Sequence, residues 1–173
     1  KPPIQIDPWS VIETSWKPEA HIMSESLFAL GNGRMGHRAN HEETFSGKHL
    51  KGSYIAGVYY PDKTKVGWWK NGYPEYFAKV LNAVNYIGID VKVNGEVVDL
   101  YTAKVSDFYR ELDMEHGVLT RRFTAALANG ATVTVEAQRF LSVVRDEVSA
   151  QQFRVTVDRT AEVVLEPYLD FNV

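Results

Sequence analysis

Residues 89–101 read IDVKVNGEVVDLY, two short runs of alternating apolar and polar residues joined by Asn94-Gly95. Alternation with period two places the apolar side chains on one face, as in a half-buried strand. Asn and Gly both tolerate the positive φ of a type I′ turn, so Asn-Gly between two such runs is a strong hairpin signal. The stretch therefore predicts an antiparallel β-hairpin.

The same alternation continues along the second half of the chain. Similar runs occupy residues 107–114, 118–127, 131–144, 147–157 and 161–169. They are separated by turn signals at His116-Gly117 and Asn129-Gly130 and by a break at Arg145-Asp146. A turn every ten or so residues is typical of an antiparallel sandwich, and no capped helical pattern competes here. The sequence predicts an all-β fold built as a large antiparallel β-sandwich.

Composition limits the kinds of partner. The chain has 173 residues, 45% of them hydrophobic and 24% charged, which suits one globular domain or part of a larger one. Its net charge is −3 and its basic residues are scattered, so we expect no nucleic-acid partner. It has no cysteine, which excludes disulfides, thiolate metal sites and cysteine nucleophiles. No apolar run approaches the roughly 20 residues needed to cross a bilayer, so no membrane partner is expected either.

A glycine-rich stretch, ESLFALGNGRMGHRAN at residues 25–40, contains the pattern G-x-G-x-x-G at Gly31, Gly33 and Gly36. A dinucleotide site would need a strand before this turn and a helix after it, because the helix N-terminus holds the pyrophosphate. Residues 26–30 suit a strand, but no apolar helical stripe follows, and the rest of the chain lacks βαβ alternation. We therefore expect the glycines to serve backbone geometry rather than a cofactor.

The stretch ESLFALGNGRMGHRANHEE, residues 25–43, also resembles the N-terminal signature of glycoside hydrolase family 65, the phosphorylases of maltose, trehalose, kojibiose and related α-glucosides. The resemblance continues through further motifs at residues 52–60, 79–100, 109–123 and 138–155. Ala39 replaces a usual glycine and Tyr86 a usual tryptophan. The matching residues of the signature are Glu25, Ser26, Leu27, Phe28, Leu30, Gly31, Asn32, Gly33, Gly36, Arg38, Asn40, Glu42 and Glu43.

The resemblance implies that residues 1–173 are an N-terminal domain, or a fragment of one, with a galactose-mutarotase-like supersandwich fold that is incomplete at its C-terminal end. The family's catalytic glutamate lies in an (α/α)6 barrel that is absent here. It follows from the resemblance that the parent protein is an inverting α-glucoside phosphorylase or hydrolase, whereas this chain alone is no enzyme. The implied partners are the missing barrel, α-linked glucosides and a second copy in a homodimer. No cofactor is implied, only inorganic phosphate as co-substrate of the parent.

Two acids in the signature are candidates for a site. Inverting cleavage needs a carboxylic acid that protonates the leaving oxygen, but nothing marks Glu42 or Glu43 as that acid. We expect them to form a salt-bridged turn with Arg38, so that Arg38, Glu42 and Glu43 join the three glycines as a structural loop. The alternative is that the acids face the barrel and shape its substrate mouth. We assign no catalytic residue.

Two histidines of the signature, His37 and His41, lie four residues apart. On a helix this spacing would place both rings on one face, as zinc sites require, but the segment is not helical in pattern and a third ligand is missing. We expect surface or hydrogen-bonded histidines and no metal site.

A long aromatic excursion supplies the candidate sugar contacts Trp68, Trp69 and Tyr73. Aromatic rings stack on the apolar faces of sugars while their polar edges still form hydrogen bonds. The chain could therefore be a stand-alone carbohydrate-binding module that recognises α-glucosides through Trp68 and Trp69. The alternative, which we favour, is that these rings pack the sandwich or its interface with the missing domain. Trp9 and Trp16 are expected in the core or at an interface.

Overall fold

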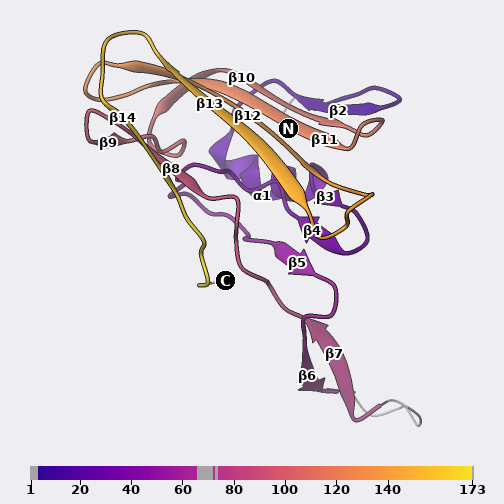
Figure 1. The fold of residues 1–173 in the computed structure, drawn as a ribbon. Coiled ribbons are helices and arrows are strands. Elements are labelled where there is room, and N and C mark those ends of the chain that lie inside the picture. The colour runs from indigo at the N-terminus through magenta and orange to yellow at the C-terminus, as the bar shows by residue number, and fades with distance from the viewer. Residues whose placement is uncertain (1–3, 66–71, 73, 173) are drawn as a thin grey trace.

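The computed structural model describes residues 4–65, 72 and 74–172 and consists mainly of antiparallel sheets (Figure 1). The largest sheet has six strands in the order β1-β2-β10-β11-β12-β13, each antiparallel to its neighbours. Its strands are β1 (Ile4–Ile6), β2 (Ser10–Glu13), β10 (Lys104–Asp113), β11 (Val118–Ala126), β12 (Thr132–Leu141) and β13 (Ser149–Val157). Gly117 and Gly130 have positive φ at the predicted turns, which confirms both hairpins.

A smaller sheet packs against one end of the first. It is formed by β14 (Val163–Pro167), β8 (Ile89–Val93) and β9 (Glu96–Val97), in that order. Asn94 and Gly95 have φ of 49° and 80°, as a type I′ turn requires, so the predicted hairpin is confirmed. Between the sheets lies the main core, whose buried apolar residues are Val91, Val93, Val98, Leu100, Phe108, Phe123, Ala125, Leu127, Ala131, Val133 and Val135. The all-β sandwich prediction is confirmed.

The first half of the chain is less regular. A 3-10 turn, η1 (Pro18–Ala20), leads into the helix α1 (His21–Leu27), and three short strands form a further sheet, β3 (Leu30–Gly31), β4 (Met35–His37) and β5 (Ser53–Ile55). The strand expected over residues 26–30 is wrong, because α1 continues to Leu27 and β3 begins only at Leu30. The buried face of this helix is polar (His21, Ser24 and Glu25), so no apolar stripe revealed it.

An arm projects from the body of the molecule (Figure 1). It is the two-stranded hairpin of β6 (Tyr59–Lys63) and β7 (Tyr76–Val80). Trp68, Trp69 and Tyr73 lie outside the described residues, so their predicted role stays a prediction.

The two N-terminal tryptophans differ in burial. Trp16 packs against the main core. Trp9 lies in the turn between β1 and β2 and is exposed, so a place in the core is wrong for Trp9. Within the described part of the chain, no helix is long and apolar enough to cross a membrane.

Candidate functional site

Three arginines on neighbouring strands of the large sheet point to the same inner face. Arg110 of β10 lies directly opposite Arg121 of β11, and Arg139 of β12 pairs with Leu119, two residues from Arg121. All three side chains are buried. Like charges placed opposite each other destabilise a sheet unless something compensates them. The site is built around that compensation.

The carboxylate nearest to Arg110 is that of Glu13 on the neighbouring strand β2, whose Oε2 lies 3.7 Å from Arg110 Nη1. The charges that compensate Arg121 and Arg139 come from the signature segment, which passes beneath the sheet. Glu43 accepts hydrogen bonds from both Nη atoms of Arg121, from Nη1 to Oε1 at 2.6 Å and from Nη2 to Oε2 at 2.5 Å. Glu42 bridges two strands, because Arg121 Nη2 donates to its Oε2 at 2.6 Å and Arg139 Nη1 to its Oε1 at 2.5 Å. Paired arginine–carboxylate contacts of this kind are strong and directional. They attach the N-terminal half of the chain to the C-terminal half.

The arginine partners differ from those expected. Arg38 does not pair with Glu42 or Glu43; its Nη2 instead donates to Ser26 Oγ at 2.5 Å and to Ile22 O at 3.4 Å. The expectation of a local turn closed by Arg38 is therefore wrong, although both acids are salt-bridged as predicted. Burial explains the change, because acids that leave water need cations that are buried with them, and the sheet supplies those.

The environment shifts the pKa values of both acids. Burial disfavours the charged form of Glu42, but the positive charges of Arg139 and Arg121 outweigh it and lower its pKa to about 2. Burial raises the pKa of Glu43 despite its pairing with Arg121, and the charge of Glu42 raises it further. A raised pKa is what a general acid needs. Glu43, however, is buried with both oxygens held by Arg121, which argues against proton transfer from it to a substrate.

The histidines of the segment are buried and hydrogen-bonded. His37 Nδ1 lies 2.6 Å from the carbonyl oxygen of Arg38, and His41 Nε2 accepts from Arg110 Nη2 at 3.0 Å. Burial, with the charge of Arg139, lowers the pKa of His37 to about 4. Burial and the charge of Arg121 hold the pKa of His41 well below its usual value. Both rings are therefore neutral at pH 7, and no metal-binding group of His, Asp and Glu occurs among the described residues.

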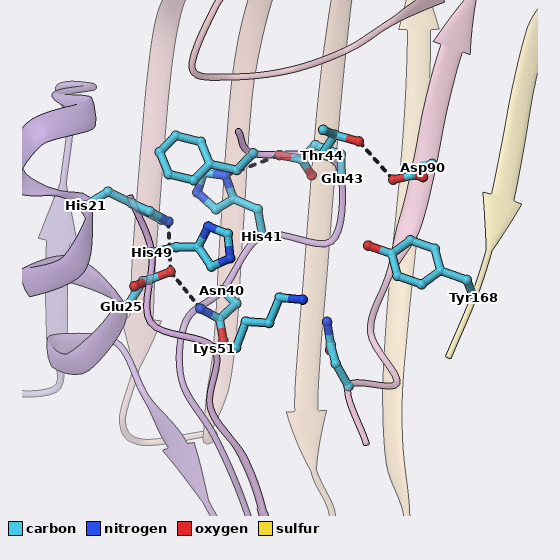
Figure 2. Close-up of a pocket in the computed structure, with 12 residues that line it drawn as sticks. His21, Glu25, Asn40, His41, Glu43, Thr44, His49, Lys51, Asp90 and Tyr168 are labelled. Atoms are coloured by element: carbon cyan, nitrogen blue, oxygen red, sulfur yellow. Dashed lines mark hydrogen bonds and ion pairs between the residues drawn. The ribbon is translucent and has the colours of Figure 1, made fainter. Parts of the chain in front are cut away.

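A polar pocket of about 270 Å³ opens beside this network (Figure 2). On the side of helix α1, Asn40 Nδ2 donates a hydrogen bond to Glu25 Oε1 at 2.6 Å. His21 Nε2 lies 3.1 Å from the same oxygen. On the far wall, Thr44 donates to Asp90 Oδ1 at 2.9 Å. The lining residues are His21, Glu25, Asn40, His41, Glu43, Thr44, Phe45, His49, Lys51, Asn85, Asp90 and Tyr168.

Most polar groups of this pocket already have partners in the chain. The Glu25 carboxylate also accepts the amide of Leu50 at 2.8 Å, and Lys51 pairs with Asp170. Lys51 and Tyr168 point toward the open space from opposite sides (Figure 2). The pocket thus holds charged groups in fixed pairs, which supports a structural role for them.

The glycine loop forms the turn between β3 and β4. Asn32 Oδ1 accepts hydrogen bonds from the backbone amides of Arg34 and Met35, at 3.0 and 2.7 Å. These amides are therefore not available to bind a phosphate. Gly33 has a φ of +90°, whereas Gly31 and Gly36 are paired within the ladder. The geometric need for glycine therefore lies at Gly33.

Sequence reasoning missed the three buried arginines, although the chain carries a signal for them. Arg121 stands in the inward-facing series of β11, between the buried residues Leu119 and Phe123. A charged residue in such a series indicates a buried ion pair. This pattern predicts that a buried carboxylate pairs with Arg121, but it does not indicate which of the 22 acidic residues supplies that carboxylate.

Comparisons with known proteins agree with this architecture. The chain matches the sequence model of the "Glycosyl hydrolase family 65, N-terminal domain" over residues 11–173. It is 45% identical to a maltose phosphorylase of Bacillus subtilis, over 98% of this chain and 22% of that protein. It is 29% identical to an alpha,alpha-trehalose phosphorylase of Thermoanaerobacter brockii, over 100% of this chain and 23% of that protein.

A solved structure supports the same assignment. It is attributed to a kojibiose phosphorylase from the human microbiome and superimposes with a TM-score of 0.88 and 32% sequence identity. It covers 100% of this chain, which spans 23% of that structure. The chain therefore spans less than a quarter of the relatives it matches. It belongs to glycosyl hydrolase family 65, as the N-terminal domain of that family.

Proposed function

We propose that this chain is the non-catalytic N-terminal sandwich of an α-glucoside phosphorylase, in which it supports the catalytic (α/α)6 barrel and the subunit interface. The observation that carries the proposal is the state of Glu42 and Glu43. They are the two acids of the family signature that are candidates for a site, and both are buried and bound to Arg121. A proton donor must reach the leaving oxygen of its substrate, so we infer that the donor lies in another part of the enzyme.

Maltose is the first substrate to test. The identity of 45% with a maltose phosphorylase exceeds the 29% with a trehalose phosphorylase and with a kojibiose phosphorylase, both of Thermoanaerobacter brockii. Inorganic phosphate would be the attacking co-substrate, and no cofactor is required by such a reaction.

The decisive experiment assays the full-length parent protein with phosphate and each of maltose, trehalose and kojibiose. We expect release of a glucose phosphate from one of them, maltose first, and none from the purified chain 1–173 with any. Product formation by the chain alone above a mock preparation would contradict the non-catalytic role. An inactive parent protein would contradict the phosphorylase assignment.

A carbohydrate-binding role through Trp68, Trp69 and Tyr73 is the second candidate. In the sequence these residues fall between β6 and β7, and the described part of that arm projects from the body (Figure 1). It carries the exposed tyrosines Tyr59, Tyr60 and Tyr76. Titration of the chain with the three disaccharides tests this role. Saturable binding that is lost in a Trp68→Ala/Trp69→Ala variant would favour this role, and no binding would favour the supporting role.

A further inference from the structure

The arm lacks cover from the rest of the described chain. Among the described strands, β6 and β7 pair only with each other, and the arm extends away from both sheets of the sandwich (Figure 1). A two-stranded hairpin by itself is at best marginally stable in water. The arm would therefore gain stability from a surface that covers one of its faces.

The two faces of the arm differ in chemistry. Residues paired across a ladder point to the same side, and successive pairs alternate between the sides. The pairs Tyr59–Val80, Pro61–Ala78 and Lys63–Tyr76 share one side. We call the exposed residues Tyr59, Pro61, Tyr76, Ala78 and Val80 the apolar arm face; the exposed Lys63, opposite Tyr76, lies on the same side at the outer end of the arm.

The opposite face is partly charged. It carries the pairs Tyr60–Lys79 and Asp62–Phe77. Lys79 Nζ lies 3.7 Å from Asp62 Oδ2 across this face. An exposed ion pair suits a surface that stays in water. Tyr60 and Phe77 are exposed aromatic residues of this same face, so the two faces differ mainly in the Asp62–Lys79 ion pair, which makes the other face the more apolar of the two.

The apolar arm face continues into a hollow at its base. The hollow measures about 230 Å³ and includes Tyr59 and Val80 in its wall. Its remaining lining comes from β4, β5 and their flanking turns: Gly33, Arg34, Met35, Gly36, Tyr54, Ile55 and Ala56. Contiguous exposed apolar surface of this kind marks contact sites.

We propose that the apolar arm face and this hollow dock the part of the same polypeptide that follows this domain. The inference rests on the proposed function and names the surface through which support is given. The chain spans less than a quarter of its relatives, so most of such an enzyme lies outside it. Because such a domain is linked covalently to this one, its effective concentration at the arm is high, and a small contact surface is enough for it to bind.

The size of the surface argues against a second copy as its occupant. The surface comprises a dozen residues, five on the apolar arm face and seven more around the hollow. Stable interfaces between free proteins use about 20–30 residues on each side. Contacts between domains of one chain can be smaller and still form.

Site-specific photo-cross-linking of the full-length protein tests the proposal. p-Benzoylphenylalanine replaces Tyr76 on the apolar arm face or, as matched control, Phe77 on the opposite face. We expect position 76 to cross-link to peptides C-terminal to residue 173 of the same chain, with a yield several-fold above that of position 77. The adjacent tyrosines Tyr59 and Tyr60, which point to opposite faces, repeat the test if a variant on β7 fails to fold.

Mixing isotope-labelled with unlabelled protein separates cross-links within a chain from those between chains. Cross-links between two chains would overturn the proposal in favour of a second copy. Equal yields from both faces, or cross-links confined to residues 1–173, would overturn it as well. Because the cross-link map needs no activity, an enzyme inactive on every α-glucoside would refute the proposed function while leaving the docking result readable.

Discussion

At the scale of single residues, Gly33 shows where backbone geometry demands glycine. Its φ is +90°, and a Cβ there would meet no atom within 4 Å. A Gly33→Ala substitution therefore costs backbone strain without any clash, and we expect the free energy of unfolding to fall by about 1 kcal/mol or more. Urea unfolding of the variant measures this loss.

Gly31→Ala is the matched control. Gly31 lacks a positive φ, and its added Cβ would lie 3.8 Å from the carbonyl oxygen of Met35, an ordinary contact. We expect a change within about 0.5 kcal/mol. Equal losses at Gly31 and Gly33 would show that the turn does not depend on the left-handed conformation.

Glu42 carries a larger share of stability because it neutralises two buried arginines at once. A Glu42→Gln variant leaves Arg121 with Glu43 and deprives Arg139 of its carboxylate. Removing one partner of a buried ion pair costs about 3–5 kcal/mol, and we expect a loss of that size in urea unfolding.

An exposed pair provides the comparison for Glu42. Glu136 accepts from Arg154 Nη1 at 3.1 Å on the outer face of the sheet, where both side chains are exposed. Glu136→Gln should cost at most about 1 kcal/mol. A Glu42→Gln loss no larger than this would mean that solvent reaches the buried network.

At the scale of elements, the buried histidines make the signature segment sensitive to acid. The pKa of His37 is lowered from 6.5 to about 4, so the unfolded chain takes up a proton before the folded one does. The stability that His37 contributes is therefore full above pH 6.5 and is lost as the pH falls toward 4. The shift corresponds to about 3 kcal/mol.

A His37→Asn variant tests this dependence, since an amide can donate in place of Nδ1–H but does not titrate. We expect a flatter decline of unfolding free energy between pH 6.5 and 4. His116→Asn is the control. A hydrogen bond to Asp113 raises the pKa of exposed His116, so the stability that His116 contributes increases as the pH falls, opposite to that of His37. A decline unchanged by His37→Asn would assign the acid sensitivity to other groups.

Elements differed in how far the sequence predicted them. The hairpins of the second half follow from local rules, because alternation and turns such as Asn94-Gly95 lie within a dozen residues. The site depends on distant pairs: Arg121 and Glu42 lie 79 residues apart. The inward position of Arg121 on β11 could be predicted from the alternation, but the choice of Glu42 as its partner is set by tertiary packing that no local pattern contains.

At the scale of the whole molecule, the buried charges hold the first half of the chain against the sheet of the second half. Apolar surface outside that junction lies exposed, notably along and after β14. Its exposed apolar residues are Val163, Leu165, Tyr168, Leu169 and Phe171. In the relatives a much longer polypeptide is available to cover such surface.

The isolated chain 1–173 should therefore self-associate, with a dimer as the first species. Leu169 and Phe171 are 60% and 73% exposed, and edge strands such as β13 offer unpaired backbone groups for pairing. Sedimentation at increasing concentration measures the association, which a Leu169→Ser/Phe171→Ser variant should weaken. Val143 and Val144 are even more exposed, at 80% and 91%, but they lie in the turn after β12 and not in the apolar series along and after β14. Serine at both positions is therefore the control and should leave the association unchanged. A strictly monomeric chain at high concentration would show that exposed apolar residues and free edges do not suffice, since association needs a contiguous surface that excludes water.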